Sequence, residues 1–147
     1  MRRTLFFATL MLAIAPAVYG REGLVYLTKP EGQDPRFTLT ALRHDDGAVL
    51  VKVVVPPDSP LYKCSYLRLD IRDMVKGKGR ILLTTKLATS KTEKGEIVAR
   101  FQIHDSLAQK ACVGFAWEAT RGKLSGDAKL ARIKDYITDK KPKPAGS

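Results

Sequence analysis

The feature that most constrains the fold of this chain is a repeated alternation of apolar and polar residues, interrupted at short intervals by turn sequences. The alternation, or a run of β-branched residues in its place, covers residues 37–41, 49–55, 64–73, 80–87 and 97–103. A period of two matches a β-strand, in which every second side chain lies on the same face of the sheet. The pattern therefore predicts an all-β fold.

Glycine-containing turns separate these predicted strands. Residues 44–47 (His-Asp-Asp-Gly) join two apolar runs, and Asp-Gly in this position is typical of a β-hairpin. The strand that follows, 49–55, has Lys52 as its single charge, which predicts a central position in a sheet. Residues 76–79 form a second turn, which is basic and rich in glycine, and residues 88–95 form a polar connection.

A short helical crossing is predicted between two later strands. Residues 104–110 suit one turn of helix, with Asp105 or Ser106 as the N-cap. The strand after the crossing places aromatic residues, Phe115 among them, on its inward face. The succession of alternating strand, crossing turn and aromatic strand over 97–117 resembles the E–F corner of immunoglobulin-like domains.

Together these patterns predict an antiparallel immunoglobulin-like β-sandwich of about seven strands with one short helical turn. The last element, 129–137, suits either a strand or a helix, because Leu130, Ile133 and Ile137 also have helical spacing. We favour a strand, because a sandwich needs a closing strand beside the one that contains Cys112.

The first 20 residues have the three parts of a secretory signal peptide: paired arginines, an apolar run over 5–15 and small residues up to Gly20. The apolar run is too short to span a bilayer. An uncleaved N-terminal anchor, and export by the twin-arginine rather than the Sec route, are the alternatives. We therefore expect a periplasmic or secreted protein whose mature chain has no membrane span, with a β-sandwich domain at 21–138.

The charge of the remaining chain favours an anionic partner. Cleavage after Gly20 removes two of the 26 basic residues and none of the 15 acidic ones, which leaves a net charge of +9. Residues 139–147 form a basic tail that we expect to be disordered. Such a charge favours an acidic protein or an anionic envelope component, and for an exported chain it does not predict nucleic acid. The alternative is that the charge serves solubility alone.

Catalytic and cofactor motifs are lacking in the sequence. It contains no Gly-x-Ser-x-Gly and no His-Glu-x-x-His. His104, Asp105 and Ser106 are adjacent in the chain and cannot align as a catalytic triad, and the turn at 44–47 accounts for the other histidine. We therefore expect neither a cofactor, nor a metal site, nor an enzyme.

Cys64 and Cys112 are the only thiols, and an even count in an oxidising compartment predicts one disulfide. Their 48-residue separation would make such a bond worth about 4 kcal/mol in the chain-entropy model. The outward alternation of both positions predicts a bridge between neighbouring strands on an outer face. Two free buried thiols or a redox pair are the alternatives.

Basic and aromatic residues on one strand face suggest a binding surface. Arginine and tyrosine are common anchors of protein interfaces, and the glycine-rich turn adds further cations. The alternative is an ordinary solvated face on which Asp70 pairs with a neighbouring arginine. The predicted surface consists of Tyr66, Arg68, Arg72, Lys76, Lys78 and Arg80.

We therefore expect an exported, non-enzymatic β-sandwich that acts as an interaction module for an acidic envelope partner. One alternative is an envelope enzyme, or an enzyme inhibitor, with a site built from loops. Another is a subunit of a secretion or pilus-like assembly, in which an exposed strand edge pairs with a neighbour.

Overall fold

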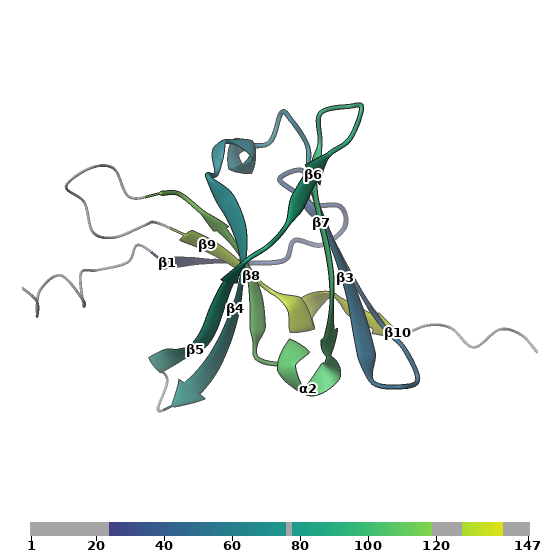
Figure 1. Ribbon diagram of the computed structural model, residues 1–147, viewed down its shortest axis with the longest axis vertical. Coiled ribbons are helices and arrows are strands. Elements are labelled where there is room, and N and C mark those ends of the chain that lie inside the picture. Colours follow the sequence, from purple (N-terminus) through teal and green to yellow (C-terminus); the bar gives the residue numbers. More distant parts are fainter. Residues whose placement is uncertain (1–23, 76–77, 119–127, 140–147) are drawn as a thin grey trace, which may run out of the picture.

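A computed structural model of the chain describes residues 24–75, 78–118 and 128–139, with only the backbone described at Met74, Val75, Lys78 and Gly79. The predicted signal peptide, Lys76 and the tail after Asp139 lie outside these residues. The described strands form two five-stranded sheets that pack face to face as a sandwich (Figure 1). The strands are β1 (Leu24–Leu27), β2 (Thr38–Arg43), β3 (Ala48–Val55), β4 (Tyr66–Val75), β5 (Lys78–Lys86), β6 (Thr89–Lys91), β7 (Ile97–His104), β8 (Ala111–Ala116), β9 (Ala128–Arg132) and β10 (Ile137–Asp139).

The first sheet, which we call sheet A, has the order β1-β9-β8-β4-β5, and the second, sheet B, has the order β10-β2-β3-β7-β6. The strand at 49–55 was predicted to be central, and β3 does lie between β2 and β7. The chain passes from sheet A to sheet B three times: between β1 and β2, between β5 and β6, and between β9 and β10.

The sheets are mixed, which corrects the prediction of an antiparallel sandwich of about seven strands. β1 runs parallel to β9, and β10 runs parallel to β2. These edge strands have 4 and 3 residues, too few to show a two-residue period. A third short strand, β6, lies within residues 88–95, which the sequence pattern assigned to a connection. The apolar run at 24–27 does predict a short strand there, which is β1, whereas β6 and β10 carry almost no signal in the sequence, because pairing rather than burial defines them.

The core lies between the two sheets, where the apolar faces of the predicted alternating strands meet. Phe37 and Phe115 pack there with ring centroids 4.9 Å apart, and each is almost fully buried. Val49, Val51, Val53 and Val55 supply every second residue of β3 to the same core. Apolar area removed from water in this way is the main stabilising contribution to such a fold, at roughly 25 cal/mol per Å².

Two predicted local features are present, one of them with a different cap. Residues 44–47 form the hairpin turn between β2 and β3, where Gly47 adopts a φ of 83° that other residues rarely tolerate. The predicted crossing is α2 (Asp105–Ala108). Its N-cap is His104 rather than Asp105 or Ser106, since the His104 side chain accepts a hydrogen bond from the Ser106 amide.

The ambiguous element at 129–137 is a strand only in its first part. β9 extends to Arg132 and pairs with β8, which contains Cys112, as the predicted closing strand. A 3-10 helix, η2 (Ile133–Tyr136), then connects it to β10. A further 3-10 helix, η1 (Pro60–Lys63), precedes β4. Within the described ranges, no helix is long and apolar enough to cross a membrane.

Candidate anion-binding site

The outer face of β4 contains a buried cluster of charges. Arg68 and Arg72 each donate a hydrogen bond from Nη2 to Asp70 Oδ2 over 3.0 Å, and Thr84 of β5 donates to Asp70 Oδ1. Asp70 is fully buried, and the two arginines are 7% and 6% exposed. The predicted alternation is correct, because the three charges share one face. A binding surface and a solvated face, the two interpretations of this strand face, both require the charges to be exposed, and that expectation is wrong.

Small residues on the neighbouring strand explain this burial. Arg68 lies opposite Gly114 of β8, and a Cβ atom added to Gly114 would stand 2.8 Å from Arg68 Cγ. The arginine stem therefore occupies space that any larger residue would need. Cys112, Ala116, Ala128 and Leu130 form a second apolar cluster on this same outer face. Long arginine stems commonly cover apolar surface in this way.

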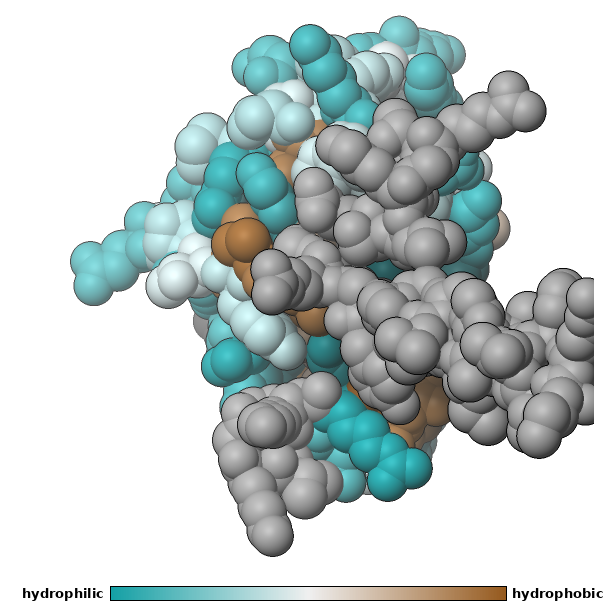
Figure 2. Space-filling model, turned by 90° about the vertical axis from the view of Figure 1, so that its left-hand side faces the viewer, coloured by the Kyte–Doolittle hydropathy of each residue, from teal (hydrophilic) through white to brown (hydrophobic). Residues whose placement is uncertain are grey.

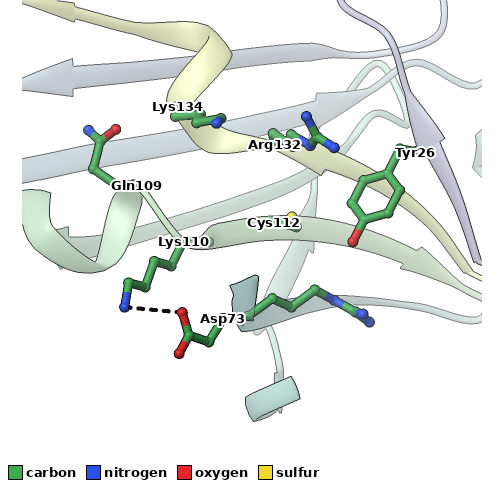
Figure 3. A pocket seen from close by; sticks show the side chains of 9 residues that line it. Tyr26, Asp73, Gln109, Lys110, Cys112, Arg132 and Lys134 are labelled. Atoms are coloured by element: carbon green, nitrogen blue, oxygen red, sulfur yellow. Dashed lines mark hydrogen bonds and ion pairs between the residues drawn. The ribbon is translucent and has the colours of Figure 1, made fainter. Parts of the chain in front are cut away.

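A half-open pocket of about 340 Å³ lies beside the charge cluster. It is formed where β1, β4, β8, β9, η2 and the turn after α2 come together, so its side chains originate far apart in the chain. Figure 3 shows Gln109 towards one end and Tyr26 towards the other, with Cys112 on the strand between them. The lining residues are Tyr26, Arg72, Asp73, Gln109, Lys110, Ala111, Cys112, Arg132 and Lys134.

The pocket has four cationic side chains and one carboxylate. Lys110 Nζ lies 3.5 Å from Asp73 Oδ1, an exposed and weak pair (Figure 3). Arg132 stacks over the Tyr26 ring, with its guanidinium carbon 4.8 Å from the ring centroid. Arg132 and Lys134 are exposed, and neither forms an ion pair with another described residue. Since Arg72 is paired with Asp70 and Lys110 with Asp73, the uncompensated charge of the pocket is that of Arg132 and Lys134.

The buried guanidinium of Arg72 has remaining hydrogen-bonding capacity. Its Nη2 group binds Asp70, but its Nε–H is buried and has no acceptor among the described residues. A buried donor without an acceptor usually costs about 1–3 kcal/mol. Arg72 also lines the pocket, so its positive charge would lie beside a bound anion, while the Nε–H itself is buried away from solvent.

The pocket thiol is unreactive at neutral pH. Burial raises the pKa of Cys112 to about 11, and nearby Arg72 only partly opposes this effect. The thiolate is the nucleophilic form of cysteine, so Cys112 is a small apolar wall of the pocket. Burial also raises the pKa of Cys64.

The structure does not contain the predicted Cys64–Cys112 disulfide, since both cysteines are free thiols. The strands are neighbours, but the register separates the two residues: Cys112 lies opposite Asp70, six residues beyond Cys64. At roughly 3.3 Å per residue this is about 20 Å along the strand, whereas a disulfide requires Cα atoms closer than about 7 Å. Cys64 also packs against the main core, while Cys112 belongs to the outer cluster.

The predicted binding surface is divided by the fold. Arg68 and Arg72 are held by Asp70, and Tyr66 is half-buried, with Lys86 Nζ 4.6 Å from its ring centroid. Arg80 is exposed on β5, near the end of the β4–β5 hairpin where Val75 pairs with Lys78. Lys78 belongs to the same strand, but its side chain is not described, and Lys76 lies outside the described residues.

Sequence reasoning missed most of the pocket. The chain contributes Tyr26, Lys110 and the pair Arg132 and Lys134 from three distant segments that no motif connects. The basic character of the chain was the only signal for them, and it identifies no particular residue.

His104 has a structural role at the start of α2. His104 caps α2, and Asp105 beside it pairs with Arg43 at 2.9 Å. Over the described ranges, no three His, Cys, Asp or Glu side chains form a group that would suit a metal ion.

Comparison with protein-family models, curated proteins and solved structures finds no match to this chain.

Proposed function

We propose that this protein is an exported, non-enzymatic binding module that holds an anionic group of an acidic envelope partner in the cationic pocket of sheet A. The observation that supports this most is the charge of the pocket: Arg132 and Lys134 have no ion-pair partner among the described residues, while Arg72 is paired with Asp70 and Lys110 weakly with Asp73. Uncompensated cations in a partly enclosed site attract anions, because the low-dielectric walls concentrate their field.

The architecture of the pocket supports a carboxylate or phosphate group as the bound element. A volume of about 340 Å³ is at the small end of the range for ligand sites, and it suits one such group with its adjoining carbon atoms. Arg72 is already oriented by Asp70, so little side-chain entropy would be lost when it binds an anion. The Tyr26 ring adds an apolar wall on which the uncharged part of the partner can rest.

Calorimetric titration at low ionic strength tests the proposal, with inorganic phosphate, citrate and polyglutamate as probes. The test variant is the double substitution Arg132→Ala and Lys134→Ala, because both side chains are exposed and unpaired among the described residues. The control is Lys52→Ala with Arg100→Ala, which removes the same charge from the outer face of sheet B, where the two residues are cross-strand neighbours. We expect the pocket variant to weaken binding about tenfold, equivalent to 1.4 kcal/mol, and the control to change it about twofold or less.

Equal losses in the two variants would mean that net charge alone attracts the probes, and the proposal would then be wrong. A further check is the salt dependence of polyglutamate binding, since screening weakens exposed charges over about 10 Å at 0.1 M salt. The pocket variant should have a shallower salt dependence than the parental chain.

We also propose that the sandwich has the immunoglobulin-like topology. The strand orders β2-β3-β7-β6 and β9-β8-β4-β5 support this, because they follow the A-B-E-D and G-F-C-C′ orders of such domains, with β1 and β10 as additional edge strands. An experimental structure that gives a different strand order would contradict the assignment.

A second candidate function, a subunit that assembles through a strand edge, is supported by the exposed strand β5. No observation in the described part of the chain favours an envelope enzyme or an enzyme inhibitor.

A further inference from the structure

β5 is the longest edge strand of the described fold. It has 9 residues and is the terminal strand of sheet A, hydrogen-bonded to β4 on one side and to no described strand on the other. Its outer side therefore offers a row of backbone N–H and C=O groups that can pair with an added strand. In Figure 1, β5 lies on the left of the molecule, away from β3 and β10.

Apolar side chains concentrate on this edge, although their exposure to water is energetically unfavourable. Ile81, Leu82 and Leu83 are consecutive and are 41%, 50% and 53% exposed. A register shift at Ile71 and Arg72 leaves Leu82 without a partner residue on β4. Figure 2 views this side of the molecule, and apolar residues reach the surface there between hydrophilic ones. Long apolar edges of this kind normally mark either an interaction site or an aggregation hazard.

The charges within β5 and the residues next to it in the chain have a single sign, although Glu118 lies 4.0 Å from Lys86 and Asp73 is the cross-strand partner of Arg80. No acidic residue occurs from residue 74 to residue 92, while this stretch contains five cations. Arg80 and Lys86 stand on either side of the apolar residues. The five cations are Lys76, Lys78, Arg80, Lys86 and Lys91.

We propose that the free edge of β5 binds an extended, acidic segment of a partner protein by strand addition. The added strand would gain main-chain hydrogen bonds along the edge, apolar contacts with Ile81 and Leu83, and ion pairs with the flanking cations. No residue of β5 lines the cationic pocket, although Arg72 and Asp73 of the pocket are the cross-strand partners of Ile81 and Arg80. The inference does not depend on the function proposed for that pocket.

Charge argues against a second copy of this chain as the occupant. In an antiparallel pair of β5 strands centred on Leu82, Lys86 would lie opposite Lys78 of the second copy. Centring the pair on Leu83 would place Lys86 opposite Arg80 of the second copy. Like charges directly opposite each other destabilise a strand pair, whereas acidic residues at the same positions of a partner would stabilise it.

The test uses a capped peptide of the length of β5, with valine and threonine at alternating positions and glutamate at both ends and in the centre. Binding to the purified ¹⁵N-labelled chain is followed by amide chemical shifts. We expect the largest shifts at residues 80–86. Two matched peptides serve as controls, one with lysine in place of glutamate and one N-methylated along one edge, which removes backbone donors and blocks strand pairing. Both should bind at least about tenfold more weakly.

Variants of the protein locate the site. Leu82→Glu introduces a negative charge into the apolar edge, and Leu50→Glu does the same at a leucine 42% exposed on sheet B. Only Leu82→Glu should weaken binding of the acidic peptide, and the Arg132→Ala, Lys134→Ala variant should leave it unchanged. Because both leucines are exposed, the far-ultraviolet spectrum should confirm that each variant is folded.

Three results would overturn the proposal. The first is equal binding of the N-methylated peptide, which would show that backbone pairing contributes nothing. The second is a set of shifts centred on the pocket rather than on β5. The third is concentration-dependent self-association that Leu82→Glu abolishes, which would make a second copy the occupant.

Discussion

β4 and β5 are adjacent strands of one sheet, yet the exposure of their charged and apolar side chains is the reverse of what residue type predicts. Arg68, Asp70 and Arg72 of β4 are at most 7% exposed, whereas Ile81, Leu82 and Leu83 of β5 are at least 41% exposed. The charged side chains of β4 are therefore shielded from water, and the apolar side chains of β5 are exposed to it. The difference comes from position in the sheet: β4 has strands on both sides, whereas β4 is the single neighbour of β5 among the described strands.

This contrast shows that a residue's neighbours, more than its type, determine its exposure. The arginines of β4 are acceptable in a buried position because Asp70 accepts a hydrogen bond from each, and because Gly114 leaves room for an arginine stem. Burial of an ion pair is costly unless its geometry is good and its other polar atoms are satisfied. Among the residues that the structure describes, none covers the leucines of β5.

The largest expected effect comes from breaking the buried charge cluster. Asp70→Ala would leave two buried guanidinium groups without their carboxylate, and we expect it to destabilise the fold by about 3–5 kcal/mol. The matched control is Asp73→Ala, whose exposed pair with Lys110 should contribute less than about 1 kcal/mol. Urea unfolding measures both, and a loss at Asp70 no larger than that at Asp73 would contradict the role of the cluster.

A second test compares two leucines of the adjacent strands. Leu67 of β4 is 1% exposed and Leu82 of β5 is 50% exposed. We expect Leu67→Ala to cost about 2–5 kcal/mol, because it removes buried contacts and leaves a cavity. Leu82→Ala should change stability by no more than about 0.5 kcal/mol. If thermal unfolding showed similar losses for the two variants, β5 would be covered in solution by something that the described residues do not include.

The smallest effect concerns Cys112, which lies opposite Asp70 on the strand next to β4. Its pKa is raised from 9.0 to about 11, because burial disfavours the thiolate. The unfolded state therefore loses its thiol proton first, and stability should fall as the pH rises from about 9 to 11, with no contribution at neutral pH.

The measurement is urea unfolding at several alkaline pH values, with Cys112→Ala as the comparison because it removes only this titration. The parental chain should lose more stability than the variant between pH 9 and 11. Identical pH profiles would show that Cys112 is accessible to water in the folded chain.

Much of the local structure could be predicted from particular residues. The Asp-Gly turn before β3, the valines of β3 and the alternation along β4 each specify local geometry within a few residues of one another. The crossing at α2 was located correctly, although its cap was not. The disulfide prediction was wrong because alternation indicates a face of the sheet but not the position along it.

The sequence by itself determined that this chain forms strands, which of their faces are apolar, and that its charge is positive. These properties follow from side-chain size, β-branching and a period of two, all of which act between near neighbours in the chain. Only the tertiary structure decided that Arg68 and Arg72 are buried, that Arg132 and Lys134 join Tyr26 at one pocket, and that β5 is an edge. Those outcomes depend on strand order and register, which bring together residues up to 108 positions apart, such as Tyr26 and Lys134.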